Sequence, residues 1–381
     1  MAQIKPDVET FAKIKVVGVG GSGCHAISRM LACKIHGVDF VAINTDSQDL
    51  HHVGASEKVH IGKNLTRGLG AGMNPEIGRQ AAEENRDEIH EVIKGSDMVF
   101  VVCGMGGGTG SGGSPVVAEA AKDSGALTVA VVTKPFSFEG KQRARIAEES
   151  LIQLKDRVDT LITIPNDKLL SIIDRKTPLL NAFSMVDDVL RQAVQGISDL
   201  VITPGIVNVD FADVKAVMQN AGSALMGIGR ATGEDRAVEA AKAAINSPLL
   251  EISIDGAKGV LFNVSGGSDL SMTEINEAAK IITESIDPEA KVIFGAVMDD
   301  KLKKGEIKVT VIATGFDEGL LQKVNETRIQ DISPVSQSSK HEDDAERNKQ
   351  FFKPKTVPVA STDEEQQDEW EVPAFIRRKM K

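Results

Sequence analysis

The chain has 381 residues, of which 41% are hydrophobic and 26% charged, and its formal net charge is −11 at pH 7. This length and composition predict two globular domains, and the acidic balance excludes general nucleic-acid binding, which depends on Lys and Arg. Three cysteines are too few for a disulfide framework, and no run is apolar enough for direct membrane insertion, so we expect a cytoplasmic protein.

Short apolar strands alternate with helices in the first half of the chain. Strands are expected from Ile14 and over 39–46, 58–62, 97–104, 127–136 and 159–167, and helices over 80–95 and 114–125. Unbroken apolar strands that alternate with helices indicate a parallel sheet covered on both faces. The first half is therefore predicted to be an α/β domain.

A long helix without proline divides the chain. Apolar residues recur three and four apart over about 180–200, and the pattern ends at the Thr-Pro-Gly of 203–205. The strands after it are fewer and farther apart, which predicts a smaller α+β domain with a mixed sheet. The expected divisions are 1–12 as an N-terminal extension, 13–179 as the first domain, 180–203 as the central helix, 204–317 as the second domain, 318–367 as a linker and 368–381 as a terminal peptide.

The end of the chain is polar and then abruptly apolar. Residues 318–367 have too few apolar side chains to offset the entropy of ordering, so a disordered linker is expected. The last residues, EWEVPAFIRRKMK, gather Trp370, Val372 and Phe375 ahead of a basic cluster. A short apolar motif at the end of a flexible segment indicates a partner-binding peptide. Chance hydrophobic residues at a disordered end are the alternative.

Two glycine-rich loops each follow a predicted strand and open a predicted helix. Backbone N–H groups at a helix N-terminus attract anions, so phosphate is the expected ligand. The first loop, Gly18-x-Gly20-x-x-Gly23, fits a dinucleotide-binding turn and also a plain tight turn. The second, GGGTGSG over 106–112, is denser than such a turn needs, and no P-loop lysine accompanies it. A triphosphate there would be met by N–H dipoles, hydroxyls and Mg²⁺.

Several motifs together resemble those of one family. GMGGGTGSG is similar to the signature loop of the tubulin/FtsZ superfamily, and NVDFAD resembles the loop by which FtsZ subunits activate each other's nucleotide. Around them VAINTD, GLGAGMNPEIGR, TVAVVTKPFSFEGKQR, LITIPND and the terminal VPAFIRR stand in the family's order. On these motifs the chain is identified as a member of the FtsZ family of bacterial cell-division proteins. The resemblance implies a Rossmann-like parallel-sheet GTPase domain over 13–179 and an activation domain over 204–317.

The resemblance also implies a binding site for GTP or GDP. Glu139 and Arg143 match positions around the ribose, and Asp187 matches the residue that reads guanine. A carboxylate suits that role because it accepts from both N1–H and the exocyclic amine of guanine, a donor pair that adenine lacks. A solvated helix acid is the alternative, and His25 stands where the family usually has asparagine. The expected nucleotide-binding residues are Gly21, Ser22, Gly23, Cys24, His25, Gly107, Gly108, Thr109, Gly110, Glu139, Arg143 and Asp187.

The expected catalytic residues are Asn208, Asp210 and Asp213, in NVDFAD. The spacing of the two aspartates puts both on one face of a helix that starts there. Beside a triphosphate they would position the attacking water, whereas a helix cap and a first-turn acid are the alternative. In the family these acids and the phosphate loops lie at opposite ends of the molecule, which implies head-to-tail filaments with hydrolysis at the shared interface.

The function that the resemblance implies is a Mg²⁺-dependent GTPase that polymerises into the division ring at the inner face of the membrane. Membrane-tethering and regulatory division proteins are expected to bind residues 368–381. Two alternatives remain at this point. One is an NAD-dependent oxidoreductase built on the first glycine loop, and the other is a nucleotide-binding scaffold without turnover.

Overall fold

The computed structural model of the chain describes residues 12–35, 37–170, 177–203, 205, 207, 209–250, 253–299 and 302–316. The expected linker 318–367 and terminal peptide 368–381 lie outside the described residues, as does the extension except for its last residue. Asn208, one of the three expected catalytic residues, also lies outside them.

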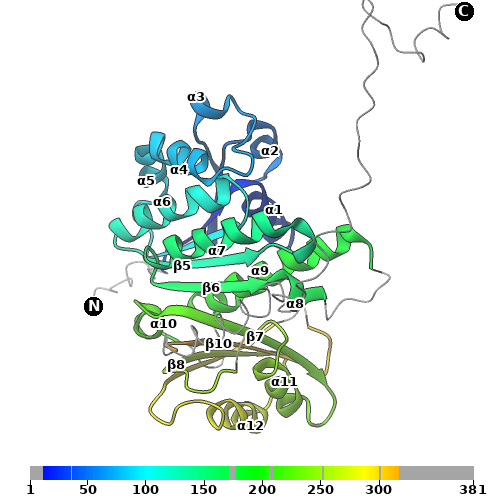
Figure 1. Cartoon of the computed structure of the whole chain (residues 1–381). Coiled ribbons are helices and arrows are strands. Elements are labelled where there is room, and N and C mark those ends of the chain that lie inside the picture. The colour runs from blue at the N-terminus through cyan, green and yellow to red at the C-terminus, as the bar shows by residue number, and fades with distance from the viewer. Residues whose placement is uncertain are drawn as a thin grey trace, which may run out of the picture. The chain divides into compact units, whose positions relative to one another are not determined.

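One ten-stranded sheet runs through the described residues, in the order β3-β2-β1-β4-β5-β6-β7-β10-β8-β9 (Figure 1). From β3 to β7 the neighbours are parallel, whereas β10 runs antiparallel to both β7 and β8, and β9 is parallel to β8. This arrangement confirms the expected fold class, a parallel sheet followed by a mixed one. The strands are β1 Ile14–Val19, β2 Val38–Asn44, β3 Glu57–His60, β4 Met98–Gly104, β5 Leu127–Lys134, β6 Thr160–Pro165, β7 Gly222–Thr232, β8 Gly259–Gly266, β9 Lys291–Met298 and β10 Glu306–Thr314.

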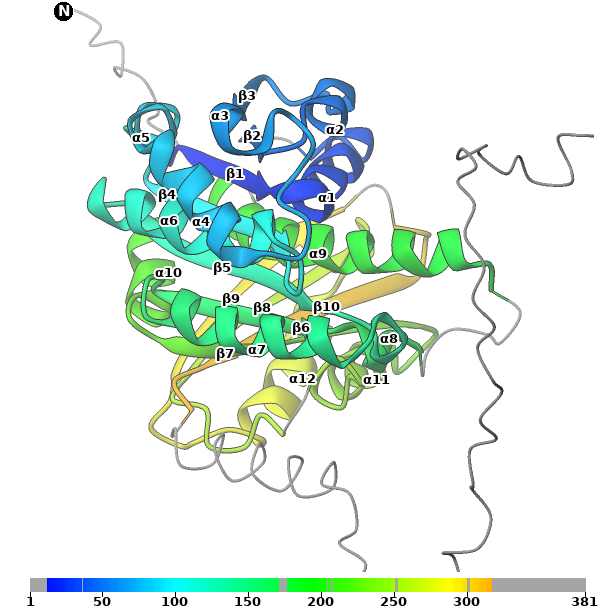
Figure 2. The ribbon, with the colours of Figure 1, turned by 45° about the horizontal axis from the view of Figure 1, so that its top comes forward.

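Helices cover both faces of the sheet (Figure 2). On one face the strands form a hydrophobic core with α1, α9 and α10. On the other face, the parallel strands form a second core with α4 to α7. The mixed strands form a third core with α11 and α12. The helices are α1 Gly20–Ala32, α2 Ser47–His52, α3 Lys63–Thr66, α4 Pro75–Glu84, α5 Arg86–Ile93, α6 Thr109–Asp123, α7 Lys141–Lys155, α8 Asn166–Leu170, α9 Leu179–Ile202, α10 Phe211–Met218, α11 Arg236–Ile245 and α12 Met272–Thr283, with a 3₁₀ turn η1 at Ser137–Glu139.

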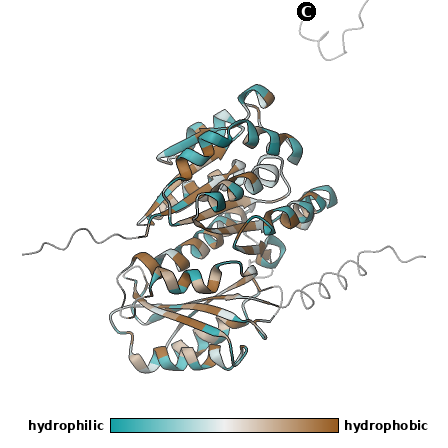
Figure 3. Ribbon diagram, turned by 90° about the vertical axis from the view of Figure 1, so that its left-hand side faces the viewer, coloured by the Kyte–Doolittle hydropathy of each residue, from teal (hydrophilic) through white to brown (hydrophobic). Residues whose placement is uncertain are grey.

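The central strands are apolar on both sides because both of their faces are covered. In β1, Val16 packs into the core beneath α1 and α9, and the next residue, Val17, packs into the opposite core. In β4, Phe100 and Val101 divide in the same way. Figure 3 shows the hydrophobic strands between helices whose outer faces are hydrophilic. Continuous apolar runs therefore mark the strands of this sheet, as expected from the sequence.

The parallel and mixed parts of the sheet meet at a short seam between β6 and β7. Only three residue pairs join these strands, Thr160–Ile162 of β6 with Gly222–Ala224 of β7. Helix α9 spans the seam, because its buried residues share one core with strands of both parts. The domain boundaries drawn at 179 and 204 stay predictions.

The predicted single helix over 80–95 is wrong in its extent. The structure has α4 from Pro75, capped by the Asn74 side chain, and a separate α5, with the break at Asn85. The Asn85 backbone leaves the helical region, and its Oδ1 accepts a hydrogen bond from the Gly62 N–H at 2.9 Å. A tertiary contact therefore interrupts a pattern that is periodic in the sequence.

The predicted start of a helix at Ser114 is also wrong, because α6 begins at Thr109 and takes in part of the glycine run. The helical glycines allow α4 to lie against α6. A Cβ on Gly112 would lie 1.8 Å from the Pro75 carbonyl oxygen, and one on Gly78 would lie 2.2 Å from the Gly108 oxygen. Gly112, which in the sequence indicated a ligand loop, thus serves close packing between two helices.

Candidate nucleotide-binding site

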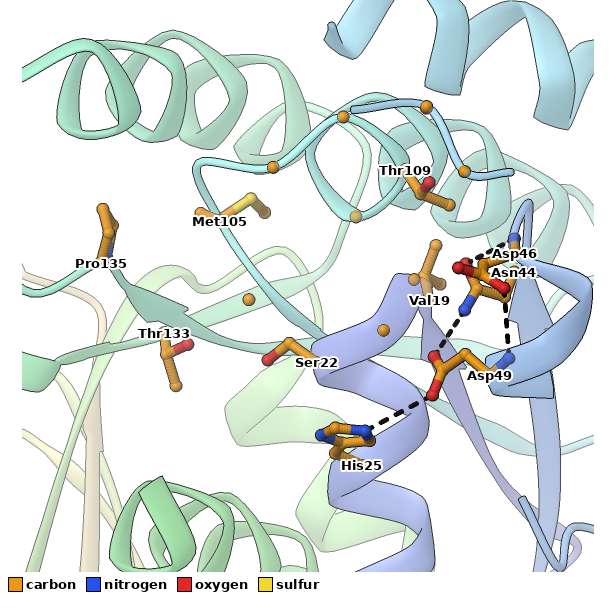
Figure 4. A pocket seen from close by; sticks show the side chains of 18 of the residues that line it. Val19, Ser22, His25, Asn44, Asp46, Asp49, Met105, Thr109, Thr133 and Pro135 are labelled. Atoms are coloured by element: carbon orange, nitrogen blue, oxygen red, sulfur yellow. Dashed lines mark hydrogen bonds and ion pairs between the residues drawn. The ribbon is translucent and has the colours of Figure 1, made fainter. Parts of the chain in front are cut away.

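A cavity of about 720 Å³ opens at the carboxyl ends of β1, β4, β5 and β6 (Figure 4). Ligands of open α/β sheets bind at this edge of the strands. The cavity is lined by Val19, Gly20, Gly21, Ser22, His25, Asn44, Asp46, Asp49, Leu69, Gly70, Ala71, Gly72, Gly104, Met105, Gly107, Gly108, Thr109, Gly110, Thr133, Pro135, Glu139, Arg143, Asn166, Phe183, Val186 and Asp187.

Two helix N-termini meet at the floor of the cavity. Gly20 begins α1 with a φ of 73°, and a Cβ there would lie 2.9 Å from the backbone nitrogen of Gly110 in the first turn of α6. Only glycine permits both this conformation and this approach. The first N–H groups of each helix lack helical partners and carry the positive end of the helix dipole. This end of the cavity is therefore built to bind an anion.

Hydroxyl groups hold the second glycine loop in place. The Thr109 Oγ1 lies 2.6 Å from the Thr45 Oγ1 at the end of β2, and the Ser111 Oγ accepts from the Gly106 N–H at 2.9 Å. Both bonds are buried, so these two hydroxyls position the loop. Ser22 is exposed on the cavity side, and its hydroxyl has no hydrogen-bond partner among the described residues. Its hydroxyl is therefore available to a ligand.

An acidic group lies beside the first glycine loop. Asp49 of α2 accepts a hydrogen bond from the Asn44 Nδ2 at 2.8 Å, and its other oxygen lies 3.4 Å from the Nε2 of His25 (Figure 4). A Cβ on Gly21 would lie 3.4 Å from the Asp49 carboxylate. Asp46 caps the N-terminus of α2, accepting from the backbone N–H groups of Gln48 and Asp49. The carboxylate of Asp49 thus stands within reach of whatever anion the loop binds.

The opposite end of the cavity is partly apolar, with a buried acid. Burial raises the pKa of Asp187 above the ordinary range, and the positive charges of His25 and Arg29 oppose that rise. Phe183, one turn earlier on α9, also lines the cavity. Asn166 is buried there, and its Oδ1 has no hydrogen-bond partner in the described part of the chain. An acceptor pair and a ring surface are suited to a flat, hydrogen-bonding base.

An ion pair closes one side of the cavity. Glu139 accepts from the Arg143 Nη1 at 2.6 Å and from the Phe136 N–H at 3.0 Å. Arg143 keeps 43% of its side chain exposed. Part of its guanidinium therefore stays accessible to a ligand hydroxyl or phosphate.

The structure brings together ten of the twelve residues predicted to bind the nucleotide. The two that do not line the cavity are buried behind the first glycine loop. A Cβ on Gly23 would lie 2.5 Å from the Val102 oxygen, so this glycine allows α1 to pack on β4. Burial raises the pKa of the Cys24 thiol to about 12, and its side chain belongs to the core. A direct nucleotide contact by any of the twelve stays a prediction.

Sequence reasoning missed part of the lining. Asn44 ends β2, and Asp46 and Asp49 follow it, so their signal was the polar run at the end of an apolar strand. Asn166 gave the same signal after β6. Asn44, Asp46 and Asn166 lay within the family motifs VAINTD and LITIPND but were not assigned to the site. The loop Leu69–Gly72 was noticed only as a family motif, although its glycines also indicated a close approach: the Gly108 N–H donates to the Gly72 oxygen at 2.7 Å.

The two predicted catalytic acids lie away from the cavity. Asp210 and Asp213 are exposed at the start of α10, and neither lines the cavity. The other end of α10 is at the amino edge of the sheet, where Thr160, the first residue of β6, donates to the Met218 oxygen. Figures 1 and 2 show α10 and α8 toward opposite ends of the strands, and α8 begins at the cavity with Asn166.

Helix α9 gives the scale of this separation. Asp187, near its start, lines the cavity, and Ile202, its last residue, packs against Gly37 just before β2, at the amino edge. At 1.5 Å per residue the helix covers about 22 Å between them. The loop with Asp210 comes after that helix end. One copy of the chain therefore cannot place both groups on one ligand without a large rearrangement.

Comparison with known proteins supports one family. The model described as "Tubulin/FtsZ family, GTPase domain" matches residues 13–174, and that described as "FtsZ family, C-terminal domain" matches residues 222–317. An empty FtsZ dimer from M. jannaschii is 51% identical, with a TM-score of 0.78, over 80% of this chain and 89% of that one. The chain belongs to the FtsZ family. A point mutant of the same FtsZ matches equally well, over 80% and 92% of the two chains.

FtsZ also shares its fold with more distant proteins. A CetZ2 protofilament from Haloferax volcanii, with GTPγS bound, is 22% identical with a TM-score of 0.69, over 84% of this chain and 100% of that one. The FtsZ assignment confirms the resemblance drawn from the motifs, and most of the cavity lining lies within the residues that match the GTPase-domain model. It favours neither the oxidoreductase nor the scaffold without turnover. Within the described ranges, no helix is both long and apolar enough to cross a bilayer.

Proposed function

We propose that this FtsZ-family protein binds GTP in the cavity and hydrolyses it only when a second copy brings Asp210 and Asp213 over that cavity. The proposal is based on the distance between the acids and the cavity, of which about 22 Å is covered by α9 from Asp187 to Ile202. Both parts face solvent, one at each end of the parallel strands. A contact between unlike ends of identical subunits repeats without closing, so it builds a filament.

The cavity suits a guanine nucleotide in one orientation. The phosphates lie at the N-termini of α1 and α6, where N–H groups and the Ser22 hydroxyl meet their charge. The guanine lies at the other end, where the Asp187 carboxylate accepts from N1–H and the exocyclic amine. The Asn166 Oδ1 provides a further acceptor there. Glu139 and Arg143 face the ribose between the two ends.

In this arrangement the chain's own groups orient the attacking water. Asp210 and Asp213 of the second copy accept its protons and aim its oxygen at the γ-phosphate. The two helix N-termini stabilise the charge that develops on the transferred phosphoryl group. Bound Mg²⁺ would neutralise phosphate charge. The described residues contain no group of three or more His, Cys, Asp or Glu suited to a metal, so nucleotide phosphates and water would hold most of its coordination sphere.

The remaining roles follow from family membership and the sequence. We propose that 13–179 is the GTP-binding domain, 180–203 the central helix and 204–317 the activation domain. Filaments form the division ring on the cytoplasmic side of the membrane. The linker 318–367 carries the peptide 368–381, which binds membrane-tethering and regulatory division proteins.

A mixing experiment tests the shared active site. Gly107 lines the cavity and a Cβ there meets no atom within 4 Å, so Gly107→Val adds a side chain at the cavity whose Cβ clashes with no protein atom. Asp210→Ala removes an exposed acid and leaves the cavity intact. Each variant alone is expected to lose GTP hydrolysis. Mixed in equal amounts they should recover roughly one quarter of the wild-type rate per subunit, because that share of head-to-tail contacts joins two intact halves.

Matched controls make the result decisive. Gly54→Val is the same substitution at an exposed glycine outside the cavity, with a nearest atom at 3.7 Å, and should behave as wild type. Asp210→Ala should still bind GTP. If the mixture stays inactive while both variants co-sediment in filaments with GTP, hydrolysis does not take place between subunits. If Asp210→Ala alone turns over GTP at the wild-type rate, Asp210 has no catalytic role.

A further inference from the structure

His25 interacts with two acids of the cavity, Asp49 and Asp187. It lies on α1 more than one turn beyond Gly20, it lines the cavity, and 69% of its side chain is exposed. Its Nε2 lies 3.4 Å from Asp49, which stands beside Gly21 of the phosphate loop. Positive charge on His25 also lowers the pKa of Asp187, at the end of the cavity where the guanine base is proposed to lie.

No other histidine lines the cavity among the described residues. Histidine is the side chain whose charge ordinarily changes near neutral pH. Among the described residues the cavity therefore contains a single imidazole, paired with the Asp49 carboxylate. A nucleotide brings several negative charges into the same space, beside Asp49.

We propose that His25 is a positioning residue that couples guanine-nucleotide binding to proton uptake, so that affinity rises as pH falls through neutrality. The proposal rests on the proposed function, since it requires that the cavity bind a nucleotide. The imidazolium neutralises Asp49 as phosphates approach Gly21 and keeps its hydrogen-bonding edge toward the ribose. Neutral imidazole leaves the Asp49 carboxylate to repel the phosphates.

The surrounding charges set the sign of the effect. Asp49 and Asp46 face His25 from the α2 side and Asp187 from α9, while Arg29 lies one turn further along α1 and the Glu139–Arg143 pair stands across the cavity. The positive charge of Lys58, on β3, lowers the pKa of Cys24, the residue next to His25 in the chain. β4 has no charged residue, and Lys15, Asp39 and Glu119 lie well away from the cavity ends of β1, β2 and α6.

These neighbours make the pH trend diagnostic. Protonation of Asp187 would weaken guanine binding as pH falls, because the carboxylate must accept two donors. Protonation of His25 strengthens binding as pH falls, because the imidazolium offsets the Asp49 charge beside the phosphates. The two groups thus give opposite slopes, so the sign of the difference between the wild type and a variant identifies which one titrates.

The test measures GDP affinity by calorimetry at pH 6, 7 and 8, with buffers of different ionisation enthalpy to count protons. For the wild type, the dissociation constant should rise about 3- to 5-fold from pH 6 to pH 8, as fits a partly exposed ion pair. A fraction of a proton should be taken up on binding at pH 7. The terminal phosphate of GDP titrates near pH 6 in every sample, so the variants are compared by difference.

Three variants isolate the histidine. His25→Asn keeps a hydrogen-bonding side chain and should remove the excess pH dependence and the proton uptake. Asp49→Asn should bind GDP more tightly than wild type at pH 8, because the repelling charge is gone. His90→Asn, on α5 and outside the cavity lining, should match wild type throughout.

The possible failures are distinguishable. If His25→Asn keeps the wild-type slope and proton uptake, or if the difference between wild type and His25→Asn is opposite in sign, the coupling to His25 is refuted while the nucleotide site stands. If the wild type fails to bind GDP at every pH, the proposed function itself falls.

Discussion

The contact between α4 and α6 predicts opposite effects for the same substitution at adjacent glycines. Gly112→Ala places a Cβ 1.8 Å from the Pro75 oxygen and 2.7 Å from the Arg79 nitrogen, both backbone atoms of α4. Gly113→Ala places it 3.3 Å from a Val19 methyl group and no nearer than 3.7 Å to any other atom. The first substitution must displace a helix, whereas the second needs only a small shift of one side chain.

The magnitude follows from two terms. Each substitution gains about 1 kcal/mol because alanine is a better helix former than glycine. Gly112→Ala also incurs overpacking at the upper end of the usual range, about 3 kcal/mol, since backbone cannot rotate away. We expect Gly112→Ala to lower the free energy of unfolding by about 2 kcal/mol and Gly113→Ala to raise it by somewhat under 1 kcal/mol. The pair should differ in melting temperature by roughly 6 °C.

Urea and thermal unfolding followed by circular dichroism measure this difference. Because Gly108 donates to Gly72 beside the displaced helix, Gly112→Ala should also weaken nucleotide binding, and Gly113→Ala should leave it unchanged. Equal stability of the two variants, or a less stable Gly113→Ala, would refute the assignment of Gly112 to helix packing.

Two further predictions concern a buried ion pair and the thiols. Arg236, only 7% exposed, donates to Glu274 at 2.6 Å and holds the start of α11 against α12, so Arg236→Met should lower the free energy of unfolding by about 3 kcal/mol in urea titrations at pH 7. The arginine lowers the pKa of Glu274, so the stabilisation is present at neutral pH and lost as acid protonates that carboxylate; a variant equally destabilised at pH 3 would contradict this origin. Burial raises the pKa of Cys24 and Cys103 to about 12, so iodoacetamide at pH 8 should label the half-buried Cys33 alone until denaturant is added. Rapid native labelling of Cys103, read by mass spectrometry, would show that its core opens.

The sequence was sufficient for the strands of the first half of the chain and for ten residues of the cavity lining. Central strands such as β4 are buried on both faces, so their apolar runs could be recognised without knowledge of their neighbours. Helix ends were harder to predict. Asn85 breaks a helical pattern because its side chain bonds Gly62, more than twenty positions away in the chain, and such a contact leaves no local signal.

The glycines illustrate the same limit at the candidate site. The sequence marks the run at 106–112 as unusual but cannot divide it into residues that face a ligand and residues that face a helix. Gly107 is open to the cavity, whereas Gly112 is in contact with α4, and the two differ only in their three-dimensional surroundings. Likewise Gly23 and Cys24 belong to a binding motif in the sequence and to the core in the structure.

The seam between β6 and β7 bears on the order in which the polypeptide folds. These strands are neighbours in the sheet, yet residues 166–221 separate them along the chain. Closing so long a loop for three residue pairs is entropically unfavourable until other contacts compensate. Strands β1 to β6 can join through short crossovers, and β7 to β10 can pair among themselves. We therefore expect the docking of α9 on both groups to be a late event in folding, which unites two sheets that nucleate separately.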